Sequence, residues 1–381
     1  MKLKNSSVSI EDALRKIDVL TSLRFFAALA VFVYHAKLLD SLLSGYRLGD
    51  VGVAFFFLLS GFIMTYVYHK KLSKLTRRGA LKFYASRFAK IYPLHIVTFL
   101  LAAPPMLKSF GVVIGGPFNE LVAQGALANL TLTQGYSNNP AILYSFNNVS
   151  WTLSLEVLFY ILFPVAMFIM GKRIRNTSAR RIAAIGFALW TIMIFFNFAL
   201  PQNLMVLPLI RLPEFFLGVM IGVLFLNRPN WSILRNKSKA TALELTALAL
   251  AFGNLALYPL MPEKTSIAVC LAPSLVLLIG VFAYQRGYIS QFLSRRAFVF
   301  LGEISFSFYM IHMMVLGRLN AIGDLGLTLF ALVVSLALSV VAYLFIEEPA
   351  RKKIKTILDR QIEKRHQQKA TPETAPENIP A

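Results

Sequence analysis

Long apolar segments recur along the whole sequence, and they restrict the chain to one class of structure. Ten segments have roughly the 20 residues that a helix needs to cross a hydrocarbon core, and 57% of the 381 residues are hydrophobic. They are centred on residues 20–38, 51–68, 84–105, 148–170, 181–200, 204–227, 241–260, 266–283, 299–318 and 325–347. We therefore predict an all-α, polytopic transmembrane helical bundle of about ten spans. Residues 118–134 could add a short or re-entrant helix.

The distribution of basic residues predicts how these spans are oriented. Of the 39 Lys and Arg residues, 30 lie in the N-terminal segment, in alternate connections and in the C-terminal tail, whereas the other connections hold 5. By the positive-inside rule, both termini are cytoplasmic and the number of spans is even. The predicted domains are a cytoplasmic segment (1–19), a transmembrane domain (20–347) and a basic cytoplasmic tail (348–381), disordered from about residue 370. Because the net charge of +21 follows the loops, no nucleic-acid partner is predicted.

The cysteine content argues against thiol chemistry. Cys270 is the single cysteine and lies in an apolar run. We therefore expect neither a disulfide nor a thiolate metal cluster, and we predict no metal site and no bound cofactor.

The first span carries two ionisable residues, although each costs on the order of 3 kcal/mol or more inside a bilayer. In "LRFFAALAVFVYH", Arg24 and His35 are eleven residues apart, which in a helix is about 16 Å and nearly three whole turns. The two side chains therefore share one face, with Arg24 near the cytoplasmic side and His35 in the outer half. The alternative is that Arg24 reaches the inner interface and His35 bonds a carbonyl near the outer one.

The fourth span carries a carboxylate on a polar face. Thr152, Glu156 and Tyr160 follow at intervals of four and lie on one side of the predicted helix. An intramembrane carboxylate indicates a functional site, and the alternative is a structural pair with an arginine of another helix.

The sixth and ninth spans add further polar groups at a similar depth. Arg211 and Glu214 are three residues apart, so the simplest interpretation is that they pair with each other. His312 lies in the outer half of the ninth span. With His35 and Glu156, these residues suggest an enclosed site that opens outward.

The cytoplasmic side carries a cationic cluster. Arg24 of the first span, the basic loop 70–78 and three cations of the third span all fall on the predicted cytoplasmic side; the three cations are Lys82, Arg87 and Lys90. Such a cluster suits an anionic ligand from the cytosol, although anionic lipid headgroups would use it too. His95, deeper in the third span, is interpreted as a buried, hydrogen-bonded histidine.

Seven motifs occur together in one order across residues 18–350. They are "LRFFAALAVFVYH", "GVAFFFLLSGFIM", "RFAKIYPLH", "SWTLSLEVLFYILFP", "RLPEFFLGVMIG", "LGEISFSFYMIH" and "FIEEPAR". In these motifs the chain resembles acyltransferase family 3, the integral membrane O-acyltransferases of bacterial envelopes.

The resemblance implies transfer of an acyl group, usually acetyl, from cytoplasmic acyl-coenzyme A to a hydroxyl on a sugar or other acceptor at the outer side. It also implies that Arg24 and His35 are the central pair, with Arg87 and Glu156 in support. Lys90 stands where many relatives have a second arginine, which keeps the charge but loses bidentate phosphate recognition.

The expected roles follow from the chemistry of each group. His35 would be the general base on the acceptor hydroxyl, and Glu156 would orient or charge-stabilise it or bind acceptor hydroxyls. Arg24, Arg87 and Lys90 would bind the donor. Candidates for binding the acceptor or stabilising the oxyanion are Trp151, Tyr160, Arg211 and His312.

The expected donor is acyl-coenzyme A, with acetyl-coenzyme A as the first to test. The other expected partners are a glycan or lipid-linked sugar as acceptor and membrane lipids. Exopolysaccharide and lipopolysaccharide O-antigen are the first acceptors to consider, and the bacterial inner membrane is the expected location. A proton-coupled secondary transporter is the main alternative, because intramembrane His, Glu and Arg residues also build proton pathways. A non-catalytic membrane sensor or assembly factor is the third.

Overall fold

The protein is all-helical over the part of the chain that the structure describes. The computed structural model describes residues 16–37, 47–74, 76–109, 119–201, 204, 206–227, 232–262 and 265–370, and these contain no strand. The helices are α1 (Asp18–Ala36), α3 (Leu48–Leu72), α4 (Arg77–Ser109), α5 (Glu120–Thr131), α6 (Pro140–Leu143), α7 (Trp151–Met170), α8 (Ala179–Ala199), α9 (Pro208–Asn227), α10 (Lys237–Leu257), α11 (Ile267–Phe282), α12 (Tyr288–Leu293), α13 (Arg296–Glu303), α14 (Ser305–Arg318), α15 (Leu325–Ala342) and α16 (Glu348–Ala370). The predicted all-α class is confirmed.

The helices long and apolar enough to span a membrane number eight among the described residues, or nine with one bent pair. That pair is α13 and α14, which meet at 60° where the ninth span was predicted. The predicted eighth span is α11, which has 16 residues and is therefore about 24 Å long, shorter than a hydrocarbon core of about 30 Å. The count of ten is thus not confirmed. Helix α5 confirms a short helix within 118–134.

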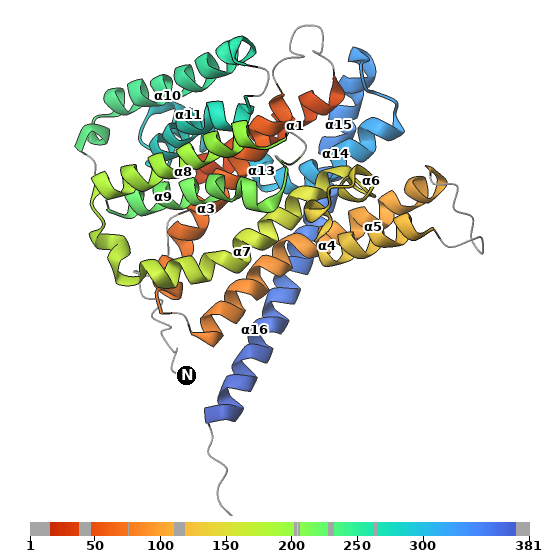
Figure 1. Cartoon of the computed structure of the whole chain (residues 1–381), viewed down its shortest axis with the longest axis horizontal. Helices are drawn as coiled ribbons and strands as arrows, with labels where there is room; N and C mark the ends of the chain where they lie inside the picture. Colours follow the sequence, from red (N-terminus) through yellow and green to blue (C-terminus); the bar gives the residue numbers. More distant parts are fainter. Residues whose placement is uncertain are drawn as a thin grey trace, which may run out of the picture.

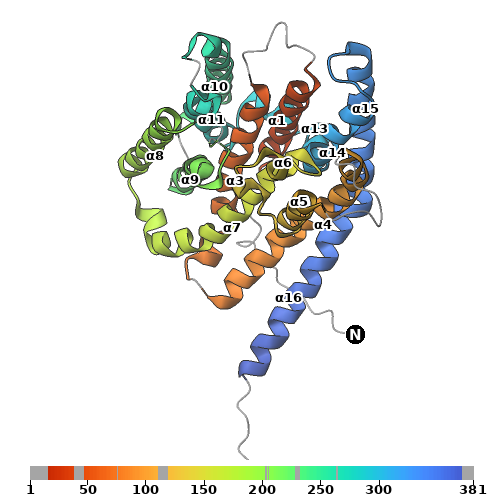
Figure 2. The same cartoon turned by 45° about the vertical axis from the view of Figure 1, so that its right-hand side comes forward.

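The arrangement places α1 and α3 at the centre of the bundle. Figures 1 and 2 show α8, α9, α10 and α11 on one side of them and α4, α5, α15 and α16 on the other. Large apolar residues cover the outside: Phe187, Phe195 and Phe252 are each 64–67% exposed. An apolar exterior of this kind requires lipid rather than water around it.

Glycines allow α3 and α9 to approach at backbone contact. A Cβ added at Gly61 would overlap the carbonyl of Phe215, and one at Gly218 would overlap the carbonyl of Leu58. Gly222 follows Gly218 at the four-residue spacing typical of close membrane helix pairs, and its added Cβ would lie 2.7 Å from the Cβ of Thr65. Dispersion contacts between these backbones therefore hold the central pair together.

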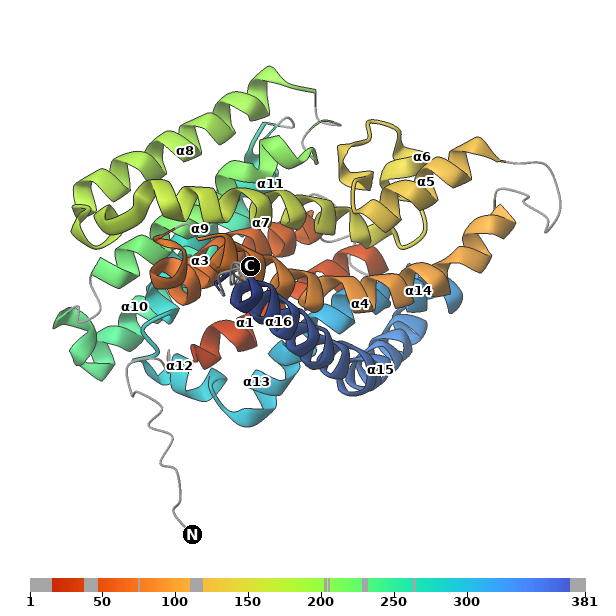
Figure 3. The same ribbon diagram turned by 90° about the horizontal axis from the view of Figure 1, so that it is seen from below.

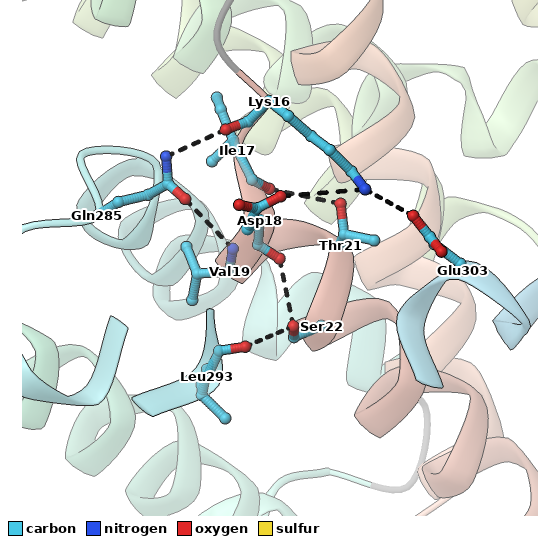
Figure 4. A network of polar contacts seen from close by, with 9 residues as sticks. All are labelled: Lys16, Ile17, Asp18, Val19, Thr21, Ser22, Gln285, Leu293 and Glu303. Atoms are coloured by element: carbon cyan, nitrogen blue, oxygen red, sulfur yellow. Dashed lines mark hydrogen bonds and ion pairs between the residues drawn. The ribbon is translucent and has the colours of Figure 1, made fainter. Parts of the chain in front are cut away.

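Polar contacts fix the start of α1 against the segment after α11 and against the last residues of α12 and α13 (Figure 4). Lys16 Nζ lies 2.6 Å from a carboxylate oxygen of Glu303. The side chain of Gln285 accepts from Val19 N and donates to the carbonyl of Lys16, both at 3.4 Å. Ser22 Oγ donates to the carbonyl of Leu293 at 2.7 Å. Two residues later comes Arg24, so these contacts set its depth in the bundle.

The helix ends separate into two groups, as the alternating charge pattern predicts. At ends assigned to the cytoplasm, Lys16 meets Glu303, and Asn227 Nδ2 donates to the carbonyl of Thr177 at 3.0 Å. At the opposite ends, Gly323 N donates to the carbonyl of Ala36 at 2.9 Å. This grouping agrees with antiparallel neighbours, and which group faces the cytoplasm stays a prediction.

The predicted tail begins with α16, which projects beyond the rest of the bundle in Figures 1 and 2 and lies against α4, beside which Figure 3 shows it. Glu363 near its far end forms ion pairs with Arg78 and Lys82 of α4. The segment 1–15 and the residues 371–381, which belong to the stretch predicted to be disordered, lie outside the described residues.

We expect Gly218→Leu to destabilise the protein by about 1–3 kcal/mol or more, because the Leu58 carbonyl belongs to a helix backbone and cannot move aside. The measurement is the melting temperature in detergent, followed by size-exclusion chromatography of heated samples. Gly253→Leu is the matched control, since a Cβ at Gly253 meets nothing within 4 Å. Equal melting temperatures for the two variants would contradict the proposed packing.

Candidate active site

A polar cavity lies in the middle of the bundle, between α1, α3, α4, α7 and α14. Its empty volume is about 480 Å³ including its open mouth. The polar residues of its wall are Arg24, Lys90, Thr152, Glu156 and Tyr309, and the apolar ones are Val53, Phe56, Phe57, Ile91, Leu153 and Phe306. The structure therefore brings together Arg24, Lys90 and Glu156, which were predicted from three separate spans.

Opposite charges meet around this cavity. Lys90 interacts electrostatically with Arg24, Arg87, Glu156 and Glu347, so these five residues form one cluster. Three cations and two carboxylates give the cluster a formal charge of +1. Buried charges are tolerated in an apolar bundle when opposite charges compensate them in this way. The one cation without a carboxylate partner could be compensated by an anionic ligand.

Glu347 is the member of this cluster that the sequence interpretation missed. It is 6% exposed, accepts a hydrogen bond from Ser307 Oγ at 2.6 Å and interacts electrostatically with Arg24. It ends the π-helical turn Tyr343–Glu347, a kind of turn that occurs frequently at functional sites. The available signal was a carboxylate at the end of an apolar span, inside the motif "FIEEPAR".

Glu156 takes part in a network of polar contacts with Tyr160 and Arg87 beside the cavity. The hydroxyl of Tyr160 donates to a carboxylate oxygen of Glu156 at 2.6 Å. Arg87 lies over the rings of Tyr68 and Tyr160, at 5.5 and 5.8 Å, and donates to the Tyr68 hydroxyl at 3.2 Å. The aromatic rings hold the guanidinium in place while they leave part of it available to a ligand.

His35 pairs with another histidine. His35 Nδ1 lies 3.0 Å from His312 Nε2, and His312 Nδ1 lies 2.7 Å from the carbonyl of Tyr309. His312 is fully buried, whereas His35 is partly exposed. The expected orientation of His35 by Glu156 is therefore corrected: His35 hydrogen-bonds to the side chain of His312 and, within α1, to the backbone of Val31. With both nitrogens occupied, His312 is also poorly placed to bind an acceptor.

Tyr309 connects the cavity with the histidine pair. Its ring lines the cavity and lies 5.9 Å from the ring of His312, centroid to centroid. Its hydroxyl donates to the carbonyl of Val149 at 3.1 Å and lies 3.2 Å from Thr152 Oγ1. The cavity wall therefore continues into the residues around His35, although His35 itself is not part of that wall.

The remaining predicted residues lie away from the cavity wall. Arg211 Nε is 3.0 Å from Glu214 Oε1, which confirms the interpretation that the two residues pair with each other, and its guanidinium lies over Phe57. Trp151 begins α7 and packs against the core. His95 is buried with Nε2 2.9 Å from the carbonyl of Asn129, as predicted.

Comparison with known proteins gives a consistent result. The family model described as an acyltransferase domain, Acyl_transf_3, matches residues 17–345. Acyltransferase MdmB of Streptomyces mycarofaciens is 32% identical over 340 residues, 82% of this chain and 82% of the relative. O-acetyltransferase OatA of Staphylococcus aureus is 21% identical over 361 residues, 89% of this chain and 58% of the relative. No solved structure matches the chain significantly. With a family match over most of its length, the chain belongs to acyltransferase family 3 and is a membrane O-acyltransferase.

Proposed function

We propose that the protein transfers an acetyl group from cytoplasmic acetyl-coenzyme A to a hydroxyl of a cell-envelope or secreted carbohydrate. The observation that carries the proposal is the position of Arg24 and His35 on α1. Arg24 lies at a cationic cavity and His35 at a hydrogen-bonded histidine pair about 16 Å further along the helix. An exopolysaccharide or an O-antigen is the acceptor to test first.

The cavity supports an anionic donor. Coenzyme A carries phosphates, and the cluster around Lys90 has one cation more than it has carboxylates. Arg24 and Lys90 would hold the nucleotide end or the arm beside it, and Arg87 would extend the cationic surface toward the cytoplasm. The apolar side chains of the cavity wall, among them Phe56, Phe57 and Phe306, suit a thin pantetheine chain better than a second polar headgroup.

The chemistry then requires one base and one leaving group. His35 takes the proton of the acceptor hydroxyl as its oxygen attacks the thioester carbonyl. A C–O bond forms, the C–S bond breaks when the tetrahedral intermediate collapses, and coenzyme A leaves as a thiol after it receives the proton from His35. The products are the O-acyl ester and free coenzyme A, and this direct transfer, the simpler account, does not require an acyl-enzyme.

The charge pattern and the relatives support the remaining details. Both termini would lie in the cytoplasm, and the membrane would be the bacterial inner membrane with anionic lipids around the basic ends. The name of OatA specifies an acetyl group and an oxygen acceptor, which favours acetyl over longer chains here.

The function is tested by the ester content of envelope and secreted glycans, measured by mass spectrometry. Cells would carry no protein, the wild type or the His35→Ala variant. Ester that appears only with the wild type would support the proposal and identify the acceptor. Equal ester in all three would refute a carbohydrate acceptor and would mean that the acceptor lies outside the glycans.

For the purified protein, we expect His35→Ala to lower kcat by a factor of about 10²–10⁴, the usual contribution of a general base. The dissociation constant for acetyl-coenzyme A should stay within about twofold of the wild type, since His35 is not part of the cavity wall. Turnover is followed by release of the free thiol. Wild-type turnover in this variant would exclude His35 as the base.

For Arg24→Gln, we expect the affinity for coenzyme A to fall by about 10- to 100-fold, because a charge-assisted contact is worth about 1.5–3 kcal/mol. Isothermal titration of the protein in detergent gives the dissociation constant. Arg318→Gln is the control, since Arg318 is an arginine at the opposite helix ends that donates to the carbonyl of Leu101. Unchanged affinity in Arg24→Gln would limit Arg24 to compensating the charges of Glu156 and Glu347.

A further inference from the structure

The two ring nitrogens of His312 have different partners, and these define its tautomer. A carbonyl oxygen only accepts hydrogen bonds, so the 2.7 Å contact with Tyr309 requires a hydrogen on His312 Nδ1. A neutral imidazole has one N–H, so His312 Nε2 carries a lone pair. His312 is fully buried and bonds to a carbonyl and another imidazole, an environment that accommodates the uncharged ring.

The tautomer of His35 follows from that of its partner. Because His312 Nε2 is an acceptor, His35 Nδ1 at 3.0 Å must carry the hydrogen of this bond. The lone pair of His35 is then on Nε2, on the side of the ring turned away from His312. His35 is the partly exposed member of the pair, so this nitrogen is the one able to meet a substrate hydroxyl.

Packing holds the ring of His312 in place. The ring of His312 stacks on Phe308, with centroids 6.0 Å apart and an interplanar angle of 23°, and lies 6.2 Å from Phe32. Around His35, Asp50 of α3 and His312 of α14 are the ionisable neighbours on other helices, and Asp50 itself is paired with Arg47 at 2.8 Å. His312 is thus the group that hydrogen-bonds to the base.

We propose that His312 is the positioning residue of this transferase, with the Tyr309 carbonyl, His312 and His35 acting as a backbone-anchored relay. This inference rests on the proposed function and deepens it. His312 Nε2 occupies the place that a carboxylate oxygen holds behind the histidine of serine hydrolases, and the carbonyl of Tyr309 holds His312 in the required tautomer. When His35 Nε2 takes the acceptor proton, its Nδ1–H stays bonded to His312 Nε2, which stabilises the resulting imidazolium.

The test compares His312→Leu with His312→Gln. Leucine removes the acceptor that faces His35, so we expect kcat to fall about 100-fold with KM for acetyl-coenzyme A within about twofold. Glutamine places an amide oxygen near the position of Nε2 and should recover at least about tenfold of that loss. A purely structural role would not separate the two variants in kcat.

His95 supplies the matched control. It is also fully buried with a nitrogen bonded to a backbone carbonyl, but that carbonyl belongs to Asn129, away from His35. His95→Leu and His95→Gln should keep wild-type kcat even where they lower the melting temperature. Wild-type kcat in His312→Leu, or equal kcat in His312→Leu and His312→Gln, would overturn the relay.

A second measurement needs no stable variant at position 312. The chain has five histidines, so ¹⁵N spectra of the labelled protein contain five pairs of ring nitrogens, and His35→Ala identifies one pair. We expect a protonated Nδ1 and an unprotonated Nε2 for His35, and the opposite tautomer would refute the relay. Absence of ester formation by the wild type would refute the proposed function, while the tautomer of His35 would be measured independently.

Discussion

The central constraint on this structure is the cost of placing charge inside an apolar bundle. Arg24 lies within α1, where an isolated guanidinium would be strongly unfavourable. Its electrostatic partners Glu156 and Glu347 come from α7 and from the turn before α16. The helices that line the cavity must therefore assemble around α1 in one arrangement, since any other would leave buried charges uncompensated. The same requirement explains why the cavity is both polar and central.

The packing of the central helices depends on glycines, which have no side chain to keep two backbones apart. Gly61 and Gly218 let α3 and α9 meet at their backbones, and Gly302 lets α13 approach the carbonyl of Thr21 in α1. Lipid supplies little hydrophobic force between helices, so such close contacts provide the dispersion energy that holds them together. The approach at Gly302 lies directly before the break between α13 and α14. This packing sends α14, with His312, toward the end of α1.

Periodicity within one helix made several features predictable. Arg24 and His35 share a face of α1, and Tyr160 reaches Glu156 one turn away. Contacts between helices were not predictable, because local spacing carries no information on which spans become neighbours. His35 and His312 are 277 residues apart. Of two adjacent glutamates, Glu347 is buried whereas Glu348 pairs with Arg351 and Lys352. The π-helical turn ends between them, and sequence spacing did not predict it.

Helix α1 is held at both ends, by Ser22 against the carbonyl of Leu293 and by the carbonyl of Ala36 against Gly323 N. It runs without a break between them, so the separation of Arg24 and His35 is constant. In the proposed reaction this separation sets the length that the arm of the acyl donor must span. A carrier whose arm spans that length brings its carbonyl to the base whatever acyl chain it holds, whereas a carrier with a shorter arm stops before reaching it.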